Sequence, residues 1–192
     1  MATISAVPRT EIQYKGQFFM EMLYKVMWQW CENHGYKDIE GAGNKVEHFY
    51  FENIMPGGGA KEVWFWWRVQ KQESKYFRYQ INIETHILGM NDAETIVDGR
   101  KVKTNNLEVS VFITSNLHID EKDMDIRKHW LTSIFDATFK GRLHKKQIED
   151  KKNELYGHTH ALINTIKQHL GLPQHAPQPR PFHDAMGVPQ LR

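Results

Sequence analysis

At 192 residues and a formal net charge of +2, the chain has room for one domain with a hydrophobic core and a short tail. The composition is globular, with 40% hydrophobic and 25% charged residues, and a charge so near zero does not by itself indicate a nucleic-acid partner. The single cysteine, Cys31, excludes an internal disulfide and favours a reducing compartment. No stretch reaches the roughly 20 apolar residues of a membrane-spanning helix, so we expect a cytoplasmic protein without membrane contact.

The N-terminal part of the chain predicts an arm followed by a helix. Residues 1–14 are interpreted as an irregular arm. Between residues 16 and 34, apolar side chains recur at spacings of three and four, which is typical of one face of an amphipathic helix. Gly35 predicts the end of this helix. Cys31 follows Met27 on the same face, so we expect a buried, inert thiol.

The middle of the chain predicts an antiparallel sheet. Residues 46–53, 62–69, 76–86 and 107–119 alternate with period two and are rich in aromatic and β-branched side chains, as strands are. Residues 56–59 and 70–75 are predicted turns, and Asp98-Gly99 is a tight-turn signal. Short connections favour an antiparallel meander of four or more strands.

After residue 123 the apolar period becomes helical. One helix is predicted from about 123 to 140, ended by Gly141, and a second from about 142 to 170, ended by Gly171 and Pro173. Residues 173–192 hold five of the seven prolines and predict an extended arm. The sequence is therefore divided into an arm (1–14), a single α+β domain (15–172) and a proline-rich tail (173–192).

Alternation sorts the strand side chains onto two faces of the sheet. One face is almost entirely apolar and is predicted to be the core, with Val63, Phe65, Trp67, Val69, Phe77, Tyr79, Ile81, Ile83, Val109, Val111 and Ile113. The other mixes aromatic and polar groups and supplies the candidate binding residues Trp64, Trp66, Arg68, Arg78, Gln80, Asn82, Glu84, His86 and Phe112.

Three interpretations of this second face remain open. Trp64 and Trp66 could pack beneath the N-terminal helix, an arm or a second subunit. The face could instead recognise RNA, with aromatic rings stacking on bases and arginines contacting phosphate. A sugar-binding face is the third interpretation.

Catalytic patterns are sparse. Glu84 and His86 share a face and could form an acid–base pair, although an ordinary polar pair on a sheet has the same spacing. Glu154 and His158 are spaced as a surface pair on a helix. The sequence contains no P-loop, dinucleotide fingerprint, nucleophile elbow or zinc-ligand spacing, so we expect neither a cofactor nor a metal site.

The segments Glu62-Val-Trp-Phe-Trp-Trp-Arg68, Tyr76-Phe-Arg-Tyr79, Ile87-Leu88-Gly89 and Asp98-Gly99-Arg100-Lys101-Val102-Lys103 resemble a group of small archaeal-type α+β proteins. The resemblance covers about residues 15–170 and includes the paired C-terminal helices. It implies a small intracellular α+β domain without an assigned activity. The predicted order of helix, four strands and two helices is also similar, in topology only, to export chaperones of the SecB type.

These observations favour a non-enzymatic binding or assembly module that acts through the mixed sheet face, the long C-terminal helix and the tail. The expected partner is another protein or a second copy of the chain. Phe182, Met186 and Leu191 are predicted apolar anchors by which the tail docks on that neighbour, and a free tail is the alternative. The other two candidate functions are an RNA- or ribosome-associated protein and an enzyme that uses Glu84 and His86.

Overall fold

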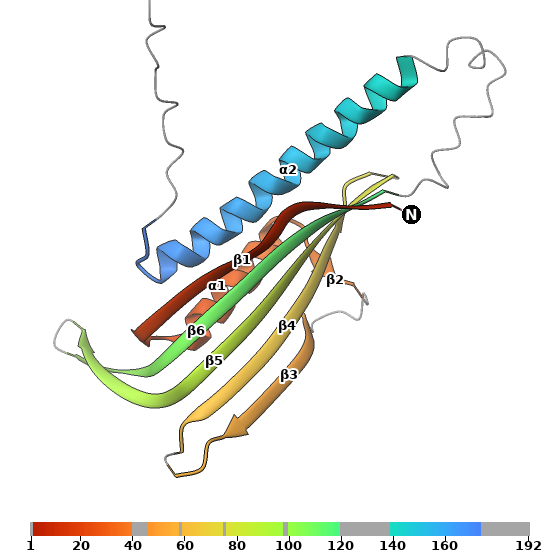
Figure 1. Ribbon diagram of the computed structural model, residues 1–192. Coiled ribbons are helices and arrows are strands. Elements are labelled where there is room, and N and C mark those ends of the chain that lie inside the picture. The colour runs from red at the N-terminus through yellow and green to blue at the C-terminus, as the bar shows by residue number, and fades with distance from the viewer. Residues whose placement is uncertain are drawn as a thin grey trace, which may run out of the picture.

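The computed structural model describes residues 2–39, 46–57, 59–74, 76–97, 100–119 and 139–173, which form six strands and two helices (Figure 1). The strands are β1 (Ala2–Phe18), β2 (Lys37–Asp38), β3 (Glu47–Ile54), β4 (Lys61–Gln72), β5 (Phe77–Val97) and β6 (Arg100–Ile119). The helices are α1 (Met20–Asn33) and α2 (Phe139–His169). The α+β class and the antiparallel sheet predicted from the sequence are confirmed.

All strands join one antiparallel sheet in the order β1-β6-β5-β4-β2, with β3 pairing with β4 along the same side as β2. Strands β3 to β6 follow one another as the predicted meander. The sheet curves around α1 and α2, which both lie on its inner side (Figure 1). Within the described part of the chain, one face of the sheet is therefore covered by the helices and the opposite face is not.

The prediction of an irregular arm at residues 1–14 is wrong, because these residues belong to β1. This strand pairs with β6 from Ala2 opposite Ile119 to Phe18 opposite Asn105. Its register is interrupted between Ser5 and Thr10, around Pro8. Proline has no N–H to donate, which is tolerated on an edge strand and at a bulge. The proline and the polar composition hid a strand whose partner lies about a hundred residues away.

The strands β5 and β6 continue beyond the sequence prediction into a two-stranded ribbon, in which residues 91–97 pair with residues 100–106. The register shifts between Leu88 and Asn91, where Gly89 has a φ of 66°. A β-bulge of this kind bends a strand, and glycine accepts positive φ without steric cost. For this charged passage the sequence predicted only a tight turn at Asp98-Gly99 and no strands, but polar residues suit a ribbon that leaves the main sheet.

The helix α1 lies within the range that the 3.6-residue pattern predicts. Leu23, Met27 and Cys31 follow at intervals of four and are buried against the sheet. The helix ends as predicted at Gly35, whose φ of 75° lets the Tyr36 N–H return to the Cys31 carbonyl at 2.8 Å. Burial raises the pKa of the Cys31 thiol to about 12, in agreement with an inert core cysteine.

The helix α2 runs from Phe139 to His169, so Gly141 lies inside its first turn and does not separate two helices as predicted. A single glycine weakens a helix by about 1 kcal/mol relative to alanine, which longer helices tolerate. The rest of the first predicted C-terminal helix lies outside the described residues. So do the tail residues 174–192 with Phe182, Met186 and Leu191.

The hydrophobic core lies between the inner face of the sheet and the two helices. Every residue predicted for the core face is buried, and Trp67 and Tyr79 are among the largest side chains that are fully enclosed. The helix α2 adds Leu155, Leu162 and Ile166. Burying one such apolar side chain stabilises the folded state by about 1.5–3 kcal/mol. The core face of the sheet is therefore the one that alternation in the sequence predicted.

Candidate interaction surface

The open face is defined here as the face of the sheet opposite the helices. All nine candidate binding residues lie on it because they alternate with the buried residues of β4, β5 and β6. They are half-buried by their neighbours within the sheet. The structure adds residues that the sequence analysis left out: Arg9 and Lys15 from β1, Phe49 and Phe51 from β3, and Glu62 and Glu108 from β4 and β6.

The carboxylate of Glu84 holds two arginines. Its Oε1 lies 2.8 Å from Arg68 Nη2, and its Oε2 lies 3.1 Å from Arg9 Nη1. The Arg9 guanidinium also lies over the Phe112 ring, 4.2 Å from its centroid. Both carboxylate oxygens are thus engaged by guanidinium groups, which is the arrangement of a structural ion-pair network. Arg9 and Arg68 are both ion-paired with this one carboxylate, which leaves the group of three side chains with a net charge of +1.

His86 has partners other than Glu84. Its ring stacks on Trp64 with centroids 3.7 Å apart and planes inclined by 14°, and its Nε2 lies 3.0 Å from Glu62 Oε1. The Trp64 indole N–H donates to the same Glu62 oxygen at 3.2 Å. Hydrogen bonds from His86 and Trp64 lower the pKa of the Glu62 carboxyl. Glu84 and His86 therefore share a face, as predicted, but each is bound to a different residue.

Four aromatic side chains gather where β3 and β4 meet, and we call this group the aromatic corner: Phe49, Phe51, Trp64 and Trp66. Phe51 is directly opposite Trp64 in the strand register, and the Phe49 and Trp66 rings lie 4.4 Å apart. The Arg68 guanidinium lies 5.6 Å from the Trp66 ring. Cross-strand aromatic pairs stabilise a hairpin, and here they also leave a broad apolar area on the open face.

The remaining candidates form a polar strip farther along β5. Gln80 donates to Asn82 at 2.9 Å, and His118 of β6 contacts both Gln80 and Thr3, the latter at 2.9 Å. Arg78 donates to Gln70 at 3.5 Å. This strip consists of side-chain hydrogen bonds within β5 and between neighbouring strands, so the open face divides into an aromatic corner and a polar remainder.

A second polar cluster lies on the helix side of the sheet, where the sequence predicted only a surface pair of Glu154 and His158. The Tyr36 hydroxyl lies 3.0 Å from His158 Nδ1. Lys151 bridges Glu73 and Glu154, at 3.1 and 2.8 Å. The i,i+4 spacing of Glu154 and His158 was visible in the sequence, but their contacts on the sheet side were not. The cluster joins α2 to the β4–β5 turn and is structural in character.

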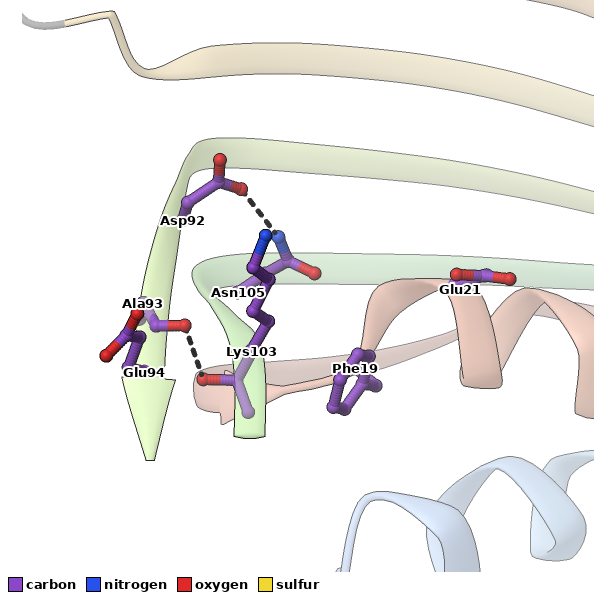
Figure 2. Close-up of a pocket in the computed structure, with 8 residues that line it drawn as sticks. Phe19, Glu21, Asp92, Ala93, Glu94, Lys103 and Asn105 are labelled. Carbon is purple, nitrogen blue, oxygen red and sulfur yellow. Dashed lines mark hydrogen bonds between the residues drawn. The ribbon is translucent and has the colours of Figure 1, made fainter. Parts of the chain in front are cut away.

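A cavity of about 450 Å³ lies between the start of α1 and the β5–β6 ribbon (Figure 2). Its lining includes three carboxylates, Glu21, Asp92 and Glu94, with Lys103 and Asn105 beside them. Asn105 donates to Asp92 at 3.3 Å, and Thr104 donates to the Ala93 carbonyl at the same distance. These contacts join the two strands of the ribbon.

In the part of the chain that the structure describes, no three His, Cys, Asp or Glu side chains are placed to hold a metal ion. Neither of the two described helices combines the length and apolar character needed to cross a membrane.

The fold and the surface define a class of protein: an α+β domain whose curved antiparallel sheet is covered by two helices on one face and presents aromatic and polar side chains on the other. No protein-family model and no curated protein matches the sequence. Among solved structures, an uncharacterised protein from Rhizobium leguminosarum aligns with 89% of this chain and 99% of its own, at 11% identity and a TM-score of 0.20. A TM-score this low does not establish a shared fold.

Proposed function

We propose that this protein is a non-enzymatic binding module that recognises another protein through the aromatic corner of its open face. The observation that supports it best is the position of Phe49, Phe51, Trp64 and Trp66 on the side of the sheet away from both helices. Aromatic residues and arginine are the side chains enriched in protein interfaces. A rigid sheet also presents them at low conformational cost.

The charges of the open face favour a protein partner over RNA. Arg9 and Arg68 are paired with Glu84, and Lys15 is paired with Glu108 at 3.4 Å. A phosphate would have to displace these carboxylates, and RNA binding depends on cations that are available to the backbone. The aromatic rings of the open face and the basic runs at residues 100–103 and 142–146 remain the support for the RNA hypothesis. Retention of total RNA on a filter at low salt would favour it over the protein-binding proposal.

An enzyme that uses Glu84 and His86 has less support. A general base needs a lone pair directed at substrate, whereas both Glu84 oxygens accept from arginines and His86 is engaged by Glu62 and Trp64. The same contacts that argue against catalysis give the open face its fixed shape. Recognition is therefore the better account of this surface.

Site-specific photo-crosslinking tests the proposal. A photoreactive phenylalanine analogue is placed at Trp64 and, as a control, at Tyr156, which lies on α2 and is 49% exposed. We expect the probe at position 64 to give a discrete adduct with a different protein in cells, and Trp66→Ser to reduce that adduct at least several-fold.

The proposal is wrong if positions 64 and 156 give the same adducts, or if position 64 gives none. Far-ultraviolet circular dichroism and thermal unfolding of each variant show whether the sheet is intact. An adduct that consists only of a second copy of this chain would also contradict recognition of a different protein.

A further inference from the structure

We propose that the protein forms a two-fold symmetric dimer in which β3 pairs antiparallel with β3 of a second copy, with Tyr50 beside the axis. This inference concerns the edge of the sheet and goes beyond the proposed function of its open face. The two edges of the sheet differ in how they are protected, and β3 carries a pattern that complements itself.

The β1 edge has the features that prevent strands from pairing with other chains. Pro8 lacks an N–H, one register irregularity precedes it and a second spans it, and Arg9 and Lys15 add charge. Prolines, bulges and basic side chains are the usual means by which proteins protect edge strands. Pairing of a second chain along β1 is therefore disfavoured.

The β3 edge lacks these features over most of its length. Residues 47–54 contain no proline, lysine or arginine, and the single register irregularity lies at the start, between Glu47 and Phe49. Among the described residues, β3 pairs with β4 alone. One side of its backbone is therefore available to a further strand.

Both faces of β3 expose large apolar side chains. Phe49 and Phe51 lie on the open face and are 39% and 48% exposed, while Tyr50 and Ile54 lie on the other face and are 53% and 63% exposed. Apolar side chains at this density on an unprotected edge mark an interaction site or an aggregation site. A further strand beside β3 would cover both sets at once.

The further strand that fits best is β3 of a second copy, because a two-fold axis can pair the two strands symmetrically. Two residues that are opposite each other in an antiparallel pair point to the same face of the sheet. A two-fold axis that runs perpendicular to the sheet and relates two copies of β3 must therefore pass beside one residue, which then faces its own copy. It cannot pass between two consecutive residues, because these point to different faces. With Tyr50 at the axis, Phe49 faces Phe51 of the second copy, and the two Tyr50 rings are neighbours. Aromatic pairs of this kind stabilise antiparallel strands.

The charged residues fit the same register. The Glu52 carboxylate, which lies 2.8 Å from Lys61, would be opposite His48 of the second copy. No two like charges then face each other. With the axis at Phe51 instead, Phe49 would face Asn53 and Ile54 would face His48, so two apolar side chains would lose apolar partners. The Tyr50 register is the better match.

Such a dimer would extend the six-stranded sheet of each copy into one continuous sheet. The two aromatic corners would adjoin across the axis, because Phe49 and Phe51 lie between it and the tryptophans of β4. The aromatic side chains of the two copies would then form one continuous group on the open face of the joined sheet.

Engineered cysteines test the register. The native Cys31 is buried and does not interfere. Tyr50→Cys is expected to form an intermolecular disulfide under mild oxidation, because Cα atoms directly opposite each other across antiparallel strands lie ~4.5–5.5 Å apart, within disulfide range. Ile54→Cys is the matched control, since its two copies would be about 26 Å apart at roughly 3.3 Å per residue. Dimers formed by Ile54→Cys and not by Tyr50→Cys would overturn the proposal.

The mass in solution provides a second, independent test. The wild-type protein is expected to sediment at twice the 22.7 kDa of the chain, and Tyr50→Lys to raise the dimer dissociation constant at least tenfold. Ile96→Lys, at another exposed apolar position in β5, is expected to leave the dimer unchanged. A wild-type protein that is monomeric at micromolar concentration overturns the proposal. Tyr50 lies off the open face, so loss of the dimer is separable from loss of the crosslink at position 64.

Discussion

His158 shows how burial controls a titratable side chain in this protein. It lies between α2 and the sheet, with Tyr36 at hydrogen-bond distance and the Tyr79 ring 6.0 Å away. Burial lowers the pKa of His158, the charge of Lys71 lowers it further, and Glu154 opposes the shift. The neutral imidazole is therefore the form that suits the folded protein.

We expect the free energy of unfolding to decrease as the pH falls below about 6.5. The folded-state pKa of His158 lies below its unfolded value, so the unfolded chain binds the proton more readily. This contribution to stability is complete above the unfolded pKa and is lost as the pH falls through the folded-state value. Urea unfolding at pH 8, 7, 6 and 5 measures it.

The matched variant is His158→Gln, which cannot take up the proton. The free energy of unfolding of this variant should change less between pH 7 and 5 than that of the wild type. His118, whose pKa is also lowered by burial, is present in both proteins and contributes equally to both. Equal pH dependence in the two proteins would show that His158 does not contribute.

At the scale of elements, β1 is a part of the sheet and not an arm. It pairs with β6 along its length and buries Val7 and Ile12. It also positions Arg9, whose Nη1 lies 3.1 Å from Oε2 of Glu84 on β5. The strand thus closes one side of the core and helps to build the open face.

The mutation Ile12→Ala is expected to lower the free energy of unfolding by about 2–4 kcal/mol, because it removes a buried side chain and leaves a cavity. Ile96→Ala is the control, since Ile96 is 71% exposed whereas Ile12 is 3% exposed, and a surface change costs less than about 0.5 kcal/mol. Denaturant unfolding compares the two. A loss below about 0.5 kcal/mol for Ile12→Ala would restore the interpretation of an arm.

At the scale of the whole molecule, the described core is complete before the tail begins. The helix α2 ends at His169, Gly171 follows with a φ of 65°, and Leu172 packs against the core. Nothing in the core of the described residues requires a contribution from beyond Pro173. The division between the domain and the proline-rich tail stays a prediction, because residues 174–192 lie outside the described part of the chain.

Deletion of residues 174–192 is expected to leave the free energy of unfolding within about 0.5 kcal/mol of the wild type. The same deletion is expected to weaken the association of the protein with the neighbour on which the tail docks. A deletion that begins at Leu170 is the control, because it also removes a buried leucine and should lower stability. Thermal unfolding and sedimentation measure the two effects. A loss of several kcal/mol from the shorter deletion would show that the tail packs on its own domain.

Local patterns predicted much of the fold because their physical causes are local. Alternation in β4 and β5 assigned Trp67 and Tyr79 to the core and Trp64 and Trp66 to the opposite face, since successive side chains of a strand point to opposite sides. The same pattern gathered the nine candidate residues on one surface. It did not predict their partners, because ion pairs such as Arg9 with Glu84 join strands that are distant in sequence.

The sequence by itself determined the class of fold, the meander from β3 to β6, the apolar face of α1 and the side of the sheet on which each candidate residue lies. Only the tertiary structure decided that residues 2–18 complete the sheet and that Glu84 and His86 hold separate partners. It alone showed that the β3 edge is exposed while the β1 edge is protected. Periodicity depends on backbone geometry within one element, whereas pairing and coverage depend on contacts between distant elements that no local pattern contains.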